Sequence, residues 1–247
     1  MVKRICLLGI FLFFLSSCAT EINPEMEQER YIRSFDDQML EEPITVRLYY
    51  QLNSAEDGYV WLSGAKGSSG TERIVLPLVF NGSKGQLPVT AVKGVREIAL
   101  SFESVLLSSS IVELQESAFE MATELISVEN VNNIRSIGNR AFFGCESLQS
   151  FKMPPSLDSI GNSAFANCRK LEISELPSSV SQIGTNAFAF CSSITSFRIG
   201  ENVTTLGAGV FDSCVNLTDI YCEASSAPAG WSAEWLENCT ATVHWGQ

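Results

Sequence analysis

SIGNRAFFGCESL, at residues 136–148, is followed 23 residues later by SIGNSAFANCRKL, at residues 159–171. The same spacing separates five phenylalanines without an insertion or deletion: Phe119, Phe142, Phe165, Phe188 and Phe211. A fixed period of about 20 to 50 residues is typical of a solenoid, in which each repeat is one coil that buries its apolar edge against its neighbours. The sequence therefore predicts an elongated body of equal coils with a phenylalanine spine.

Other residue types keep the same register, and we call each set of equivalent positions a column. Four residues before each phenylalanine the chain has Gln115, Gly138, Gly161, Gly184 and Gly207. Three residues after it stand Ala122, Cys145, Cys168, Cys191 and Cys214. Aliphatic columns lie on both sides of these. With 45% hydrophobic residues, the chain can fill such a core.

One coil can be divided into three parts. Residues 148–153 alternate apolar and polar side chains, as a strand with one buried face does. Two prolines end this strand, and a second short extended run, residues 156–160, leads to a turn at Gly161. Residues 162–168 then form a short helical or irregular arc whose Ala, Phe and Cys point inward. The expected fold class is α/β leaning to β-rich.

The N-terminus has the features of a secretory signal peptide, residues 1–17. Lys3 and Arg4 precede an apolar run too short for a stable membrane span. The sequence LSSC at residues 15–18 resembles the lipobox of bacterial lipoproteins, in which cleavage before the cysteine leaves it as a lipid-bearing N-terminus. We expect Cys18 to be the lipidation site, with a plain secretory signal cut elsewhere as the alternative.

Residues 18–42 are rich in Asp and Glu and predict a flexible, solvated tether. The chain has 16 basic and 28 acidic residues, so loss of Lys3 and Arg4 with the signal leaves a mature net charge of −14. Such a body repels nucleic acid and anionic membrane surfaces. Attachment to a membrane must then come from the lipid.

Most of the 8 cysteines do not suggest disulfides. Four of them share a column with Ala122, which indicates a small buried apolar group, and stacked neighbours have poor geometry for a bridge. No C-x-x-C unit or nearby histidine favours a metal site. Cys222 and Cys239 could pair with each other in an oxidising compartment.

The units at residues 136–148 and 181–194 resemble the BspA-like leucine-rich repeat family, because Ile-Gly, Ala-Phe, Cys and Leu recur together in register. The resemblance covers about residues 89–222. It implies a right-handed, curved leucine-rich repeat solenoid of about five coils, with a parallel sheet on one face. It divides the chain into a β-rich N-terminal cap (43–94), the solenoid (95–222) and a C-terminal cap (223–247). Members of the family are commonly secreted or surface proteins that bind host or neighbouring-cell components.

Catalysis is not indicated. His244 is the only histidine, so a Ser-His-Asp triad or a histidine metal site would have to be built around it. We expect it to be a cap residue on a half-buried strand. Acid pairs such as Glu172 and Glu175 occur on any acidic surface, and a plain coil array supplies no deep cleft. The chain is predicted to be no enzyme and to need no metal or cofactor.

Candidate binding residues lie on the outward face of the strands. One outward column has alternating charge and ends in an aromatic residue: Glu129, Lys152, Glu175, Arg198 and Tyr221. The other includes Ile173 and Asp219. Two interpretations stay open, a self-neutralising charge ladder that keeps the sheet soluble and a polar recognition strip with Tyr221 as anchor.

The strand pattern breaks at Ile173 and Ser174, where the apolar residue falls on the outward position. Either the strand bulges by a residue or Ile173 is exposed, which would favour binding. Trp231, Trp235 and Trp245 form a second candidate surface, although packing over the end of the core is the favoured interpretation.

The sequence thus predicts a monomeric, lipid-anchored extracytoplasmic protein, of the outer membrane or cell surface, that binds a protein or glycan ligand in adhesion. The alternatives are a scaffolding envelope lipoprotein and an accessory carbohydrate-binding protein.

Overall fold

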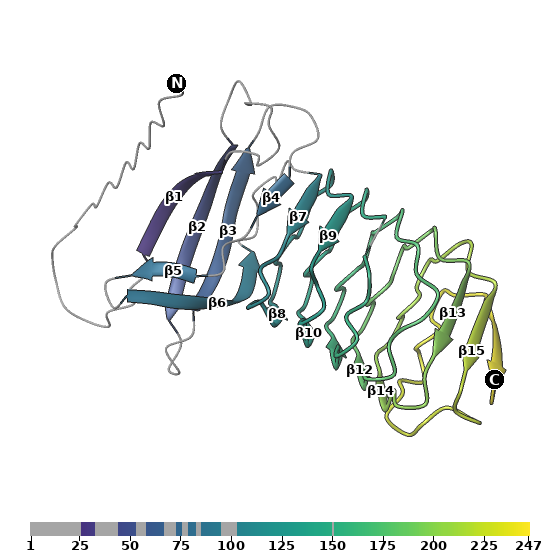
Figure 1. Ribbon diagram of the computed structural model, residues 1–247. Coiled ribbons are helices and arrows are strands. Elements are labelled where there is room, and N and C mark those ends of the chain that lie inside the picture. The colour runs from purple at the N-terminus through teal and green to yellow at the C-terminus, as the bar shows by residue number, and fades with distance from the viewer. Residues whose placement is uncertain are drawn as a thin grey trace, which may run out of the picture.

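The protein is a right-handed parallel solenoid preceded by a mixed β-sheet (Figure 1). The structure, a computed structural model, describes strands at residues 26–32, 44–52, 58–66, 73–75, 79–82 and 85–94, and then residues 103–149 and 151–247. The expected signal peptide and Cys18 lie outside the described residues. The described part contains strands and turns but no helix.

The N-terminal strands form a sheet that leads into the coils. Its members are β1 (Met26–Ile32), β2 (Ile44–Leu52) and β3 (Gly58–Lys66), which pair antiparallel, then β6 (Gly85–Gly94), parallel to β3, and β5 (Val79–Gly82), antiparallel to β6. β1 lies within the stretch predicted to be a flexible tether, so the structure differs from that prediction over residues 26–32. Its backbone pairs with the edge of β2, and an edge position suits a charged segment.

One side of the solenoid carries a sheet that we call the continuous ladder. From β6 it runs in parallel register through two-residue strands: β8 (Glu113–Leu114), β10 (Ser136–Ile137), β11 (Ser159–Ile160), β12 (Gln182–Ile183) and β14 (Thr205–Leu206). The second residue of each is aliphatic and at most 2% exposed. Gln115 follows β8, and a glycine follows each of the other four strands. The glycine is needed there because the coils approach closely: a Cβ on Gly184 would lie 2.6 Å from the backbone nitrogen of Asn162.

The strands identified from their alternating pattern form a second sheet, the interrupted ladder. Its first part is β4 (Arg73–Val75), β7 (Ser104–Leu106) and β9 (Ser127–Glu129). Its second part is β13 (Ser196–Ile199), β15 (Asp219–Cys222) and β16 (Thr242–Trp245). Between them residues 151–153 form no strand, and Glu175 makes a single bridge to Arg198. The strand expected at residues 148–153 is therefore absent over residues 151–153, where the nearby prolines lack the N–H that a ladder needs.

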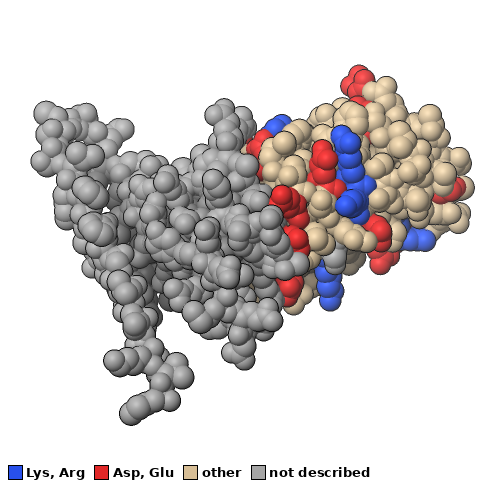
Figure 2. Space-filling model, turned by 90° about the horizontal axis from the view of Figure 1, so that it is seen from above, with Lys and Arg blue, Asp and Glu red and all other residues tan. Residues whose placement is uncertain are grey.

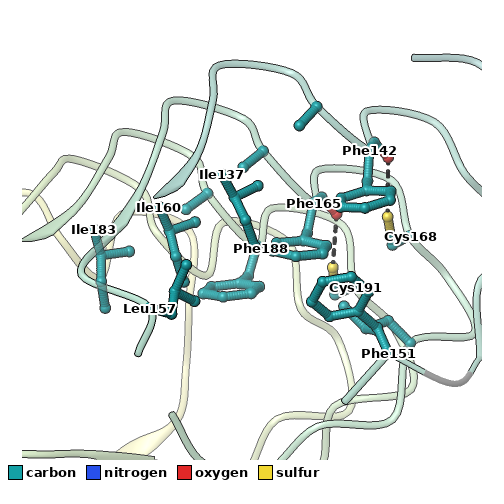
Figure 3. Packing of buried hydrophobic residues seen from close by; sticks show 14 of the residues in the cluster. Ile137, Phe142, Phe151, Leu157, Ile160, Phe165, Cys168, Ile183, Phe188 and Cys191 are labelled. Atoms are coloured by element: carbon teal, nitrogen blue, oxygen red, sulfur yellow. Dashed lines mark hydrogen bonds between the residues drawn. The ribbon is translucent and has the colours of Figure 1, made fainter. Parts of the chain in front are cut away.

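The phenylalanine spine is confirmed. Successive rings stack with centroids 5.1 to 6.0 Å apart and interplanar angles of 6 to 19°. All five rings are 0% exposed. Phe151 packs edge-on against Phe142 and Phe165, which extends the stack toward the interrupted ladder (Figure 3).

The arc that carries each spine phenylalanine is made of turns, not of helix. The residues two before and two after the ring have positive φ, for example Ser163 (53°) and Asn167 (62°) around Phe165. Two left-handed residues so close together interrupt helical geometry. Backbone N–H groups of the arc bond instead to the next coil, as Phe165 N does to Ala187 O at 2.8 Å.

The cysteine column has a hydrogen-bonding role that a buried apolar position alone does not explain. Each thiol donates to the carbonyl of the spine phenylalanine in the preceding coil: Cys145 Sγ to Phe119 O, Cys168 to Phe142, Cys191 to Phe165 and Cys214 to Phe188, at 3.0 to 3.1 Å (Figure 3). These cysteines are free, and burial raises the pKa of each thiol. A column of alanines would leave those carbonyls without this donor.

The 23-residue register continues into residues 223–247, the segment expected to be a cap. β16 pairs in parallel with β15, so Val243 lies one period after Ile220. Earlier in the segment Trp231 bridges Leu206, 25 residues away, which indicates two extra residues at the start. The segment is therefore a further coil.

Candidate functional site

The outward column of the interrupted ladder forms a row that we call the outer strip. By the 23-residue period it comprises Glu129, Lys152, Glu175, Arg198 and Tyr221. Strand pairing places Glu175, Arg198 and Tyr221 side by side and adds His244 to the row. The pairing of β15 with β16 places His244 beside Tyr221. His244 was expected to be a cap residue, but its distance of 23 residues from Tyr221 is the signal that assigns it to the row.

The alternating charges of the outer strip do not close into ion pairs along its middle. Lys152 and Glu175 are exposed, and Arg198 is half-buried. Within residues 103–149 and 151–247, no ion pair joins Lys152 to Glu175 or Glu175 to Arg198; the pairs found there are Arg140–Glu120, Arg169–Glu146 and His244–Asp219. The two ion pairs that a self-neutralising charge ladder would form between Lys152, Glu175 and Arg198 are therefore absent.

At the C-terminal end of the outer strip, Arg198, Tyr221 and His244 form a chain of contacts that continues to the neighbouring Asp219. We call these four residues the aromatic cluster. The rings of Tyr221 and His244 stack with centroids 4.8 Å apart and an interplanar angle of 15°. The Arg198 guanidinium carbon lies 5.7 Å from the Tyr221 ring centroid, and its Nη1 donates to the Gln247 carbonyl at 2.8 Å. His244 Nε2 lies 2.8 Å from Asp219 Oδ1.

Hydrogen bonds fix the charge state of Asp219. The bond from His244, and next that from Thr218 Oγ1 at 2.8 Å, hold the pKa of the Asp219 carboxyl below its ordinary value. The carboxylate is therefore ionised at neutral pH and only accepts hydrogen bonds. It follows that His244 Nε2 is the donor, so the imidazole is held in one orientation with Nδ1 on the other side.

The break in the strand pattern does not expose an apolar residue. Ile173 is half-buried and packs against the core, whereas Ser174 is exposed. Ile173 has the same partial exposure as Ser127 and Ser196, which occupy its column, and the bridge of Glu175 to Arg198 keeps the 23-residue register in this coil. Ile173 is therefore a half-buried candidate of the binding face, not a fully exposed one.

The C-terminal tryptophans pack on one another and on the core. Trp231 and Trp235 are 8% and 6% exposed, and Trp231 Nε1 donates to Val203 O at 2.8 Å. Trp245 completes the group at 5.8 Å from Trp231 and 6.5 Å from Trp235. The packing interpretation is confirmed for the two buried rings.

Cys222 and Cys239, which could have formed a disulfide, are free thiols in the structure. Cys222 is buried in β15. Asn238 O accepts a bond from Ser213 N, so Cys239 follows the register of Cys214. Cys239 therefore extends the cysteine column into the last coil.

The described residues show no arrangement for metal or nucleophilic chemistry. No group of His, Cys, Asp and Glu among them could hold a metal ion. In the same part of the chain the side-chain partner of His244 is Asp219, and no serine or cysteine bonds to the ring. A search of these residues for a helix long and apolar enough to cross a membrane finds none.

Charge is unevenly spread over the solenoid. Seen from above, acidic and basic side chains lie side by side over the middle coils, and the surface toward the C-terminal end is mostly uncharged (Figure 2). The largest exposed apolar side chains of the described residues are Met121, Ile126, Phe190 and Val215.

Coils of constant length, a buried ring spine and an exposed row of polar side chains define a repeat solenoid of the interaction-module class. The chain belongs to the BspA type leucine-rich repeat family, whose repeat region matches residues 112–240 in 6 copies. The match reaches beyond residue 222, as the additional coil does.

Solved structures of several bacterial leucine-rich repeat proteins are similar to this chain. A protein from Bacteroides ovatus is 27% identical over 75% of this chain, with a TM-score of 0.59; this chain spans 47% of its length. The T. pallidum protein TpLRR is 25% identical, with a TM-score of 0.58, and the alignment covers 80% of this chain and 95% of that one. The pneumococcal vaccine antigen PcpA, at 20% identity and a TM-score of 0.58 over 81% of this chain and 53% of its own, shares the fold. No curated protein matches the sequence.

Proposed function

We propose that the protein is an envelope-anchored, extracytoplasmic binding module, held by lipid on Cys18, that captures a ligand of a neighbouring surface through the outer strip. Leucine-rich repeat proteins of this family are generally non-enzymatic interaction modules and are typically surface-exposed. The proposal adds the anchor, the adhesive role and the binding face. It treats the protein as a monomer without catalytic activity, and its charge of −14 disfavours nucleic acid as a partner.

One observation carries the proposal: the outer strip ends in an arginine and two stacked aromatic rings, while its middle charges have no direct ion pair. Arg and Tyr are enriched among the residues that dominate binding energies. Charges without a direct partner keep their Coulomb interaction available to a ligand. The coils hold the row at about 4.8 Å per strand, so a ligand meets a preformed surface.

Binding arrays of host-matrix proteins and glycans test the face. We expect the wild type to bind at least one component, and the double variant Lys152→Glu/Arg198→Glu to lose it. Gln182→Ala is the matched control, because Gln182 is an exposed strand residue of the continuous ladder. Equal binding by the double variant and the control would rule out the outer strip.

The anchor and its orientation need a cellular test. Cys18→Ala should release the protein from membranes, and retention of that variant in the membrane fraction would refute lipid anchoring. Protease added to intact cells should cleave the wild type if it faces outward. Protection from the protease would contradict adhesion and support the scaffolding alternative.

A further inference from the structure

The outward faces of β13, β15 and β16 form a compact array of hydrogen-bonding side chains that we call the polar grid. Parallel register sets its members in three rows of two: Ser196 and Arg198, Asp219 and Tyr221, Thr242 and His244. Strands lie about 4.8 Å apart and alternate residues of one strand about 6.6 Å apart, so the grid measures about 10 by 7 Å. That is the footprint of one or two sugar rings, far below a protein interface of about 800 Å² per partner.

The grid offers both donors and acceptors to a ligand. Arg198 has N–H groups beyond the one that bonds Gln247. Asp219 accepts from His244 and Thr218 and has lone pairs left. Among the described residues no side-chain partner is found for the hydroxyls of Ser196, Tyr221 and Thr242. Sugar hydroxyls donate and accept at once, so they match such a mixed set.

The side chains of the grid are held in place before any ligand arrives. Stacking fixes Tyr221 against His244, and the bond to Asp219 fixes the rotation of the imidazole. Arg198 is tied at its tip to a backbone carbonyl. Groups that are already ordered lose little conformational freedom on binding, which favours a small polar ligand whose own contacts are weak.

We propose that the polar grid binds a neutral oligosaccharide, a ligand class that rests on the proposed function and refines it. No aliphatic side chain belongs to the grid, whereas the centre of a protein interface is depleted of charge and desolvated. Arg198 and Asp219 compensate each other within the grid. The whole chain carries a net charge of −12, which repels acidic glycans.

His244 supplies a direct readout, because it is the only histidine in the chain. The folded wild type is titrated at neutral pH with millimolar neutral oligosaccharides of glucose, mannose, galactose and N-acetylglucosamine, and the imidazole resonances are followed by NMR. At least one series should shift them in a saturable way. Arg198→Gln and Tyr221→Ala should weaken that binding about tenfold or more, a difference of about 1.4 kcal/mol. Gln182→Ala should bind as the wild type does.

Three results would overturn the inference: no shift of the His244 resonances with any neutral oligosaccharide, shifts with acidic oligosaccharides only, or binding that Tyr221→Ala leaves unchanged. Tyr221→Phe keeps the stacked ring and loses only the hydroxyl, so a loss of binding in this variant cannot come from misfolding. The two proposals can fail separately. If a protein ligand binds the wild type but not Lys152→Glu/Arg198→Glu, and no sugar shifts the His244 resonances, the oligosaccharide inference is wrong and the proposed function is still supported. Failure of both assays would remove both.

Discussion

Replacing Phe165 with alanine is the most direct perturbation of the spine. The ring is 0% exposed and contacts three others, with centroids 5.1 Å from Phe142, 5.5 Å from Phe188 and 5.4 Å from Phe151. Removing a buried phenylalanine costs about 3 to 5 kcal/mol. Each aromatic pair adds about 0.5 to 1.5 kcal/mol beyond burial, and three are lost. We therefore expect the upper part of the range.

Urea unfolding followed by circular dichroism measures the loss. With a slope of about 1 to 3 kcal/mol per molar urea, the midpoint should fall by more than about 1 M. Phe190→Ala is the matched control, because Phe190 belongs to the neighbouring arc and is 48% exposed. Its free energy of unfolding should change by no more than about 0.5 kcal/mol.

A loss below about 1 kcal/mol for Phe165→Ala would refute the reasoning, since a ring inside a stack cannot leave so small a gap unless the coils collapse into it. Equal losses in the two variants would show that burial in the spine is not what makes the phenylalanine column stabilising.

Three further outcomes follow from the structure. Burial raises the pKa of Cys214 to about 12 and that of Cys222 to about 11, so these two thiols should not react with a thiol reagent at pH 8 in the native protein, and urea should restore the reaction. Labelled peptides identified by mass spectrometry separate them from the half-buried Cys239, and native labelling at Cys214 or Cys222 would contradict their burial. Because the pKa of Asp219 is lowered, its contribution to stability is present at pH above the unfolded value of 3.8 and is lost as pH falls through the folded value. The wild type should therefore be more stable than Asp219→Asn at neutral pH, and the two should converge in acid; a difference that stays constant down to the most acidic pH would refute the assignment. Gly184→Ala should lower the free energy of unfolding by about 1 to 3 kcal/mol, because the added Cβ would lie 2.5 to 2.6 Å from atoms of Asn162. Gly200→Ala is the control, since the nearest atom to its Cβ would be 3.7 Å away, and its melting temperature should stay near that of the wild type. Similar melting temperatures for both variants would argue against close packing of the coils.

The interior was the part of the fold that the sequence could predict. A strict period places the same side chain at the same point of every coil, so the stack from Phe119 to Phe211 follows from spacing alone. The arcs were less certain because turns and short helices share their composition. Positive φ at residues such as Arg140 and Phe190, which rarely adopt it, is imposed by bonds to neighbouring coils and has no local signal.

The candidate site was predicted only in part. The row from Glu129 to Tyr221 was found from its spacing, and His244 was missed because the last coil opens with two extra residues, which disturb the register before β16 restores it. The lack of direct ion pairs at Lys152 and the turn of Arg198 toward Tyr221 depend on side-chain rotamers. A column of residue types does not contain that information.

The two ladders differ in mechanical stiffness, which follows from the gap between β9 and β13. On one side of the solenoid every coil is tied to the next by parallel strands. On the other side, between β9 and β13, the described residues have one bridge at Glu175 and single backbone hydrogen bonds such as Gln149 N to Ile126 O. A rod bound firmly along one edge and loosely along the other bends most easily where the loose edge can open or close. We expect tension applied along the solenoid to be absorbed in these middle coils. The spacing between Lys152 and Glu175 of the outer strip would then change under tension, whereas the spacing between the stacked rings of Tyr221 and His244 would stay the same.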